Sequence, residues 1–116
     1  MDKLGLHFGL NNSDLTHTLI QWGETNTSAL FEHDTSNKIV DFVLNVFGTG
    51  VLNGETIATL PPAMRPPTNA TFDVFGIQDD NNIHLLYCTV YTSGVINIAS
   101  SNYNGKIMSC TANGKF

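Results

Sequence analysis

The chain has 116 residues, which is enough for one domain with a single hydrophobic core and too few for two. Only 13% of the residues are charged and the formal net charge is −5, so the clustered cations that bind a phosphate backbone are missing and nucleic acid is excluded as a partner. No apolar stretch is long enough to span a bilayer and Met1-Asp2-Lys3 does not resemble a signal peptide, so we expect a soluble, cytosolically made chain without membrane insertion.

The first sixteen residues are read as a separate segment. Apolar Leu4, Leu6, Phe8 and Leu10 alternate with other residues, and the alternation stops in a polar stretch at 11–14. We interpret residues 1–16 as a connector or stem-proximal segment and place the folded domain at residues 17–116.

Two short apolar runs follow, at 17–22 and 28–32, and a polar loop at 34–37 closes them. Trp22 is the only tryptophan; it is either a core residue or an exposed platform on which a sugar ring can stack. His33 precedes Asp34 and the loop, so it is the histidine best placed for a polar contact.

The clearest strand covers residues 39–47. One face carries Val40, Phe42, Leu44 and Val46 without exception. The other face is partly apolar through Ile39, Val43 and Phe47. We therefore expect this strand to be covered on both sides, by a second sheet and by a further subunit.

A corner built from all four prolines occupies residues 61–67. Before it, Asn53-Gly54 predicts a two-residue hairpin turn into a strand at 56–60. Leu60 and Arg65 each precede a proline and should be extended, which makes the corner a rigid arm along the surface. The planar donor fork of Arg65 suits a carboxylate, a backbone carbonyl or a sugar hydroxyl, and in the simplest alternative it only ties the arm to its neighbour.

The rest of the chain continues as strands and turns. Alternation at 72–76, a polar turn at 79–82, and runs at 83–92, 95–99 and 106–112 predict further strands, with Gly94 at a position that needs positive φ. About eight strands at turn spacings near ten residues, without a helical period, predict an all-β fold: an antiparallel β-sandwich or a jelly-roll-like barrel.

No residue pattern predicts a catalytic or metal site. Cys88 and Cys110 belong to no CxxC motif or Cys/His cluster, so we expect free buried thiols and no metal or other cofactor. Asp79 and Asp80 lack the ligand spacing of a calcium loop. Because no nucleophile elbow, HExxH motif or phosphate-binding glycine loop occurs, we expect a protein that is not an enzyme.

Several short sequence features occur in a recognisable order. They are Leu60-Pro61, Arg65-Pro66-Pro67, Phe72-Asp73-Val74, the apolar run at 83–91 and Gly94-Val95-Ile96-Asn97-Ile98. Together they resemble the C-terminal head domains of bacteriophage tail fibres and baseplate receptor-binding proteins, in which such a corner leads into a strand and then a hairpin. The resemblance covers residues 39–112.

The resemblance implies a function in host adhesion. Such a domain would be a homotrimer in the virion, assembled in the host cytoplasm, and would bind host cell-wall polysaccharide while attached to other tail or baseplate proteins. Its candidate saccharide contacts are Trp22, His33, Asp34 and Arg65, which offer a stacking face and hydrogen-bonding groups. One alternative is an assembly module that docks another virion protein through a dry apolar surface. Another is a free-standing carbohydrate-binding module, which needs a Trp/Tyr strip.

Overall fold

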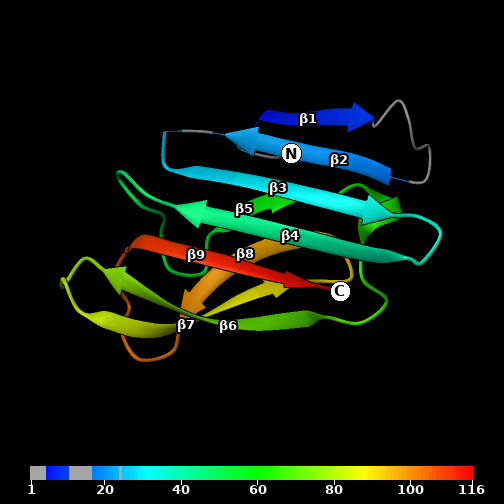
Figure 1. Cartoon of the computed structure of the whole chain (residues 1–116). Helices are drawn as coiled ribbons and strands as arrows, with labels where there is room; N and C mark the ends of the chain where they lie inside the picture. Colours follow the sequence, from blue (N-terminus) through cyan, green and yellow to red (C-terminus); the bar gives the residue numbers. More distant parts are fainter. Residues whose placement is uncertain (1–4, 11–16, 24) are drawn as a thin grey trace.

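The computed structural model describes residues 5–10, 17–23 and 25–116, and these residues form an all-β fold without an α-helix (Figure 1). A single 3-10 turn, η1 (Pro62–Met64), lies in the proline corner. In the described ranges no helix is long and apolar enough to cross a membrane. The strands are β1 (Gly5–Leu10), β2 (His17–Gly23), β3 (Thr27–Asp34), β4 (Ile39–Val46), β5 (Thr56–Thr59), β6 (Ala70–Gln78), β7 (Ile83–Val90), β8 (Val95–Ser100) and β9 (Ile107–Lys115).

The described strands make one antiparallel sheet in the order β1-β2-β3-β4-β9-β6-β7-β8-β5. Strand β9 joins its two halves: Cys110–Lys115 of β9 pair with β4, whereas Ile107 and Ser109 pair with β6. The sheet curls about this strand, so that buried residues of both halves form one core. This arrangement is consistent with the predicted β-sandwich or barrel-like fold.

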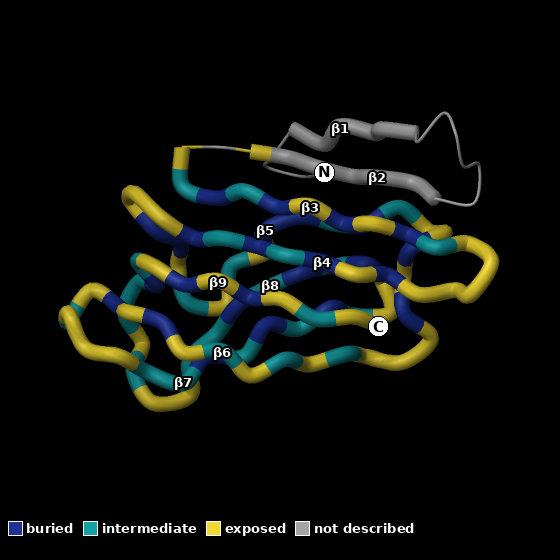
Figure 2. The backbone as a smooth tube through the Cα atoms, viewed as in Figure 1, coloured by how far each residue is buried: buried dark blue, intermediate teal, exposed yellow. Residues whose placement is uncertain are grey.

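Side-chain alternation decides which face of each strand is buried (Figure 2). On β4, the four residues predicted to share a face are all buried, namely Val40, Phe42, Leu44 and Val46. On the other face, Ile39 is 37% exposed, and Phe47, which directly follows the strand, is 41% exposed. The second sheet half therefore covers one face of β4, and no described part of the chain covers the other.

Four phenylalanines link the two halves of the sheet at one end of the core. Phe31 and Phe42 stack with ring centroids 5.2 Å apart, and Phe42 meets Phe72 edge to face at 5.0 Å. Phe116 contacts both Phe42 and Phe72, at 6.0 and 6.4 Å. Such aromatic pairs add to the stabilisation from burial alone, so this cluster fixes how the two halves meet.

The predicted Asn53-Gly54 hairpin is wrong. These residues do form a turn, in which the N–H of Glu55 donates to the carbonyl of Leu52, but the flanking segments do not pair with each other. Val51 instead bridges to Ile107, and β5 pairs with β8. The Asn53 side chain accounts for the difference: its Oδ1 accepts the N–H of Ser100 at 2.7 Å, which ties the turn to the end of β8.

Other sequence predictions are confirmed. Gly94 has φ of +87°, and polar turns occur at 34–37 and 79–82. Cys88 and Cys110 are free and buried.

The predicted connector at 1–16 is described only in part. Residues 5–10 of it form β1, which pairs with β2 along its full length. Residues 1–4 and 11–16, and with them the predicted boundary after residue 16, lie outside the described residues.

Gly76 lies on β6 and faces residues of β7 and β9 at close range. A Cβ atom at this position would lie 2.6 Å from Leu86 Cδ1 and 2.8 Å from Cys110 Cβ. We expect Gly76→Ala to destabilise the fold by about 1–3 kcal/mol, because overpacking forces neighbouring backbone apart. Urea unfolding measures this free energy. Gly23→Ala is the control, since nothing lies within 4 Å of its Cβ position; an equal loss in both variants would contradict the steric explanation.

Because the two cysteines are buried, we expect the free energy of unfolding to decrease at alkaline pH. Burial raises the pKa of the Cys88 thiol to about 12 and that of Cys110 to about 11. The unfolded chain releases these protons above about pH 8.5 while the folded chain retains them, so the free energy of unfolding should fall as pH rises from about 9 to 11. The double variant C88A/C110A should lack this part of the pH dependence.

The thiols should also be unreactive in the native state. A disulfide reagent at pH 8 should modify neither cysteine until urea unfolds the chain, because the thiolate is the reacting form. Rapid labelling of the folded protein would contradict the burial.

Candidate functional site

A cavity of about 450 Å³ opens at one end of the curled sheet. Three segments that are far apart in the sequence meet there: the β3–β4 turn, the proline corner and the last residue. The lining residues are His33, Thr35, Lys38, Val40, Ala63, Met64, Arg65, Pro66, Pro67 and Phe116. Rigid, partly apolar walls with a few polar groups are typical of small-ligand sites.

The proline corner is anchored at both ends, which makes it a firm wall of this cavity. Leu60 and Met64 are almost completely buried, and the Leu60 N–H donates to the carbonyl of Gly94 at 2.9 Å. Arg65 Nε donates to the Leu60 carbonyl, also at 2.9 Å. Arg65 is extended, with φ of −81° and ψ of 138°, as expected for a residue before proline.

Gly94 makes this anchoring possible. Its φ of +87° disfavours any side chain, and a Cβ there would lie 2.6 Å from Arg65 Nε. The turn between β7 and β8 therefore leaves the space in which the arginine side chain reaches Leu60.

Phe116 supplies the aromatic part of the cavity. Its N–H donates to the Val40 carbonyl at 2.9 Å, and the Val40 N–H donates back to the Phe116 carbonyl at 2.7 Å. The ring also contacts Phe42 and Phe72. Phe116 is thus held by backbone and side chain together, and its ring position is set by the core.

The structure brings two of the four predicted site residues together. His33 and Arg65 line the same cavity, although thirty-one positions separate them in the sequence. Trp22 lies on β2 opposite Ala29, four positions along β3 from His33 and so about 13 Å away along the strand. The side chain of Trp22 is outside the part of the structure that is described.

The Asp34 carboxylate is occupied by its own turn. Oδ1 accepts the N–H groups of Ser36 and Asn37, both at 3.1 Å, and Oδ2 accepts the Asn37 side-chain amide at 2.8 Å. Asp34 therefore shapes the turn that carries the cavity residues Thr35 and Lys38.

Sequence reasoning missed Lys38 and Phe116. A lysine that follows a polar turn and an aromatic final residue carry no signal of their own, and both reach the cavity only through the fold. Ala63 and Met64 belong to the proline corner. The sequence predicted this corner as a rigid arm, but it did not predict that these two residues would line a cavity.

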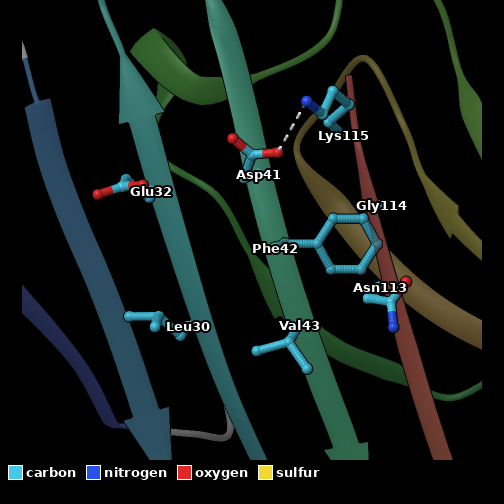
Figure 3. A pocket seen from close by; sticks show the side chains of 8 residues that line it. All are labelled: Leu30, Glu32, Asp41, Phe42, Val43, Asn113, Gly114 and Lys115. Atoms are coloured by element: carbon cyan, nitrogen blue, oxygen red, sulfur yellow. Dashed lines mark ion pairs between the residues drawn. The ribbon is translucent and has the colours of Figure 1, made fainter.

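A second hollow of about 440 Å³ lies on the outer face of β3, β4 and β9 (Figure 3). Leu30 and Val43 form its apolar part, with Glu32 on β3 and Asn113 on β9 at its sides. Lys115 Nζ lies 3.7 Å from Asp41 Oδ1. None of the predicted saccharide contacts lines this hollow.

A polar cluster joins the β6–β7 turn to the loop at 101–106. His84 Nε2 and Asp80 Oδ2 are 2.8 Å apart, and the His84 ring stacks on Tyr103. Tyr103 donates to Asp79 at 2.6 Å, and this hydrogen bond raises the pKa of the phenol. Partial desolvation acts to raise the pKa of Asp80, but hydrogen bonds from His84 and Asn82 outweigh it and the pKa is lowered. These contacts give the His84 side chain an acceptor and a stacking partner within the fold.

No protein-family model matches the chain, and no curated protein matches it.

The role of Asp34 in the turn can be measured. We expect Asp34→Ala to lower the free energy of unfolding by about 1–2 kcal/mol, because the turn N–H groups of Ser36 and Asn37 lose their acceptor. Asp34→Asn keeps an amide oxygen at the same place and should lose less than half as much. Urea unfolding of both variants tests this, and equal losses would argue against the hydrogen-bonding role.

Proposed function

We propose that this chain is a non-catalytic head domain of a phage tail or baseplate and that it binds host cell-surface saccharide in the cavity lined by His33 and Arg65. One observation carries the proposal: two residues singled out in the sequence for hydrogen bonding to sugars line one cavity beside the Phe116 ring. Sugars are bound by directed donors and acceptors together with a flat apolar face.

The cavity supports weak binding at a single site. It is small, and much of its wall is proline, methionine and phenylalanine. We propose that a homotrimer, repeated many times on a virion, supplies the avidity that one site lacks. Trp22 remains a separate proposed contact on β2, outside the cavity lining, and Asp34 contributes through the turn that it shapes.

The second candidate is an assembly module, and an exposed apolar surface favours it. Phe75 and Ile83 are each 70% exposed, and Ile77 is 40% exposed. Ile77 and Ile83 are direct partners in the β6–β7 register, and Phe75 pairs with Leu85. Contiguous exposed apolar side chains mark surfaces that contact other proteins, here another tail or baseplate protein.

Titration with cell-wall polysaccharide from candidate host bacteria tests the saccharide proposal. We expect the NMR signals of the His33 ring and the Arg65 side chain to shift, while those of Leu30 and Val43 in the outer hollow do not. Light scattering on the same sample should give a solution mass three times the 12.6 kDa of one chain.

A variant that fills the cavity provides the control. Ala63 is an exposed lining residue, and Ala63→Phe should weaken saccharide binding about tenfold or more by occupying the space, which corresponds to about 1.4 kcal/mol. Ala99→Phe adds the same bulk on the outer side of β8 and should leave binding unchanged. Unchanged signals with every polysaccharide, together with self-association or partner binding that Phe75→Ser abolishes, would favour the assembly module instead.

A further inference from the structure

The cavity at the proline corner has the opposite charge to the rest of the chain. The chain contains ten Asp and Glu against five Lys and Arg. Yet the cavity is lined by Lys38, Arg65 and His33, and by no Asp or Glu side chain. The nearest carboxylate in sequence, that of Asp34, accepts hydrogen bonds within its own turn. Among the side chains that line the cavity, the charged groups are therefore only basic, although the chain as a whole is acidic.

Arg65 presents a fixed donor fork. Nε is bound to the Leu60 carbonyl, while no hydrogen bond or ion pair to a described residue involves the two Nη groups. The backbone is held between the buried residues Met64 and Pro66. A guanidinium held in this way can bind a carboxylate or phosphate with two parallel hydrogen bonds.

His33 adds a buried polar ring. It is only 8% exposed, and its imidazole forms no hydrogen bond or ion pair with any residue in the described ranges. The His33 nitrogens are not among the fully buried side-chain atoms, so they are accessible from the cavity that the residue lines and can hydrogen-bond a ligand there.

Lys38 occupies a position that is unfavourable for its residue type. Its φ of +57° is left-handed, a conformation in which glycine or asparagine is preferred. The turn hydrogen bonds come from Asp34, so Lys38 is not required for them. The ammonium group of Lys38 adds a second cation to the cavity lining.

We propose that the cavity binds an anionic group, a carboxylate or a phosphate, carried by an acidic saccharide. This inference rests on the proposed saccharide-binding function and specifies its ligand class. Arg65 binds the oxyanion through its fork, Lys38 contributes a second charge from the turn, and His33 donates from the cavity wall. Phe116 provides the apolar face for the sugar ring.

Matched small ligands test the ligand class. Glucose 6-phosphate, glucuronate, glucose and inorganic phosphate are each titrated into the intact chain while the His33 ring signals are followed by NMR; His33→Gln identifies those signals among the four histidines. We expect the two acidic sugars to bind about tenfold or more tightly than glucose, because charge-assisted hydrogen bonds are roughly twice as strong as neutral ones.

Charge variants distinguish binding at this cavity from a non-specific effect of the net charge of the protein. Lys38→Gln should weaken binding of the acidic sugars about threefold to tenfold, and it should weaken glucose binding less. Lys106→Gln removes the same charge at the opposite end of β9 and should change neither. Arg65→Lys keeps the charge but loses the fork, so it should weaken binding more than Lys38→Arg does.

The outcomes distinguish this inference from the function on which it rests. Equal affinities for glucuronate and glucose would overturn the anion preference and leave saccharide binding intact. Absence of binding by every sugar and by the host polysaccharides would overturn both. Inorganic phosphate binding as tightly as glucose 6-phosphate would overturn the saccharide part, because the sugar would then contribute nothing. Equal weakening by Lys38→Gln and Lys106→Gln would overturn the assignment to this cavity.

Discussion

The divided pairing of β9 is the constraint on which the rest of the structure depends. One strand uses its first residues to pair with β6 and its remaining residues to pair with β4, so the sheet must bend where the partners change. Gly76 permits this bend, since the space of its missing side chain is taken by Leu86 and Cys110. Once the sheet bends, the inward faces of its two halves can only bury their apolar side chains against each other, which is the main driving force for the fold.

The cavity is a consequence of the same curl. The β3–β4 turn belongs to one half of the sheet, whereas the proline corner connects β5 and β6 of the other half. Phe116 follows β9, the strand between the halves, and packs against aromatic rings from both. The cavity therefore forms where the halves meet at one end, and its walls are as rigid as the core that supports them. Prolines suit this position because a corner outside the sheet loses no ladder hydrogen bonds.

The sequence correctly predicted features that depend on neighbouring residues. It failed where a contact with a residue far away in the sequence determines the structure. Alternation identified the buried face of β4, and the need for positive φ identified Gly94, because both are properties of a few neighbouring residues. Asn53-Gly54 has the composition of a hairpin, yet the amide of Asn53 binds Ser100, and this contact outweighs the local preference. His33 and Arg65 were chosen separately for their donors; nothing in their own segments required them to share a cavity, and Lys38 joins them only through the turn that Asp34 shapes.

The contrast between an acidic chain and a basic cavity limits how such a site can work. At physiological ionic strength charges are screened beyond about 8 Å. The cations of the cavity therefore attract only anionic groups that are already close to it. At low ionic strength, where charges act over longer distances, the net charge of −5 repels an acidic polymer and slows its approach. A single domain of this kind would select its ligand at contact while gaining little speed of association from electrostatics. Many domains presented together offset that weakness, because once one site is occupied its neighbours bind at high effective concentration. Under the proposed function, selectivity would come from the cavity and affinity from the repetition of the domain.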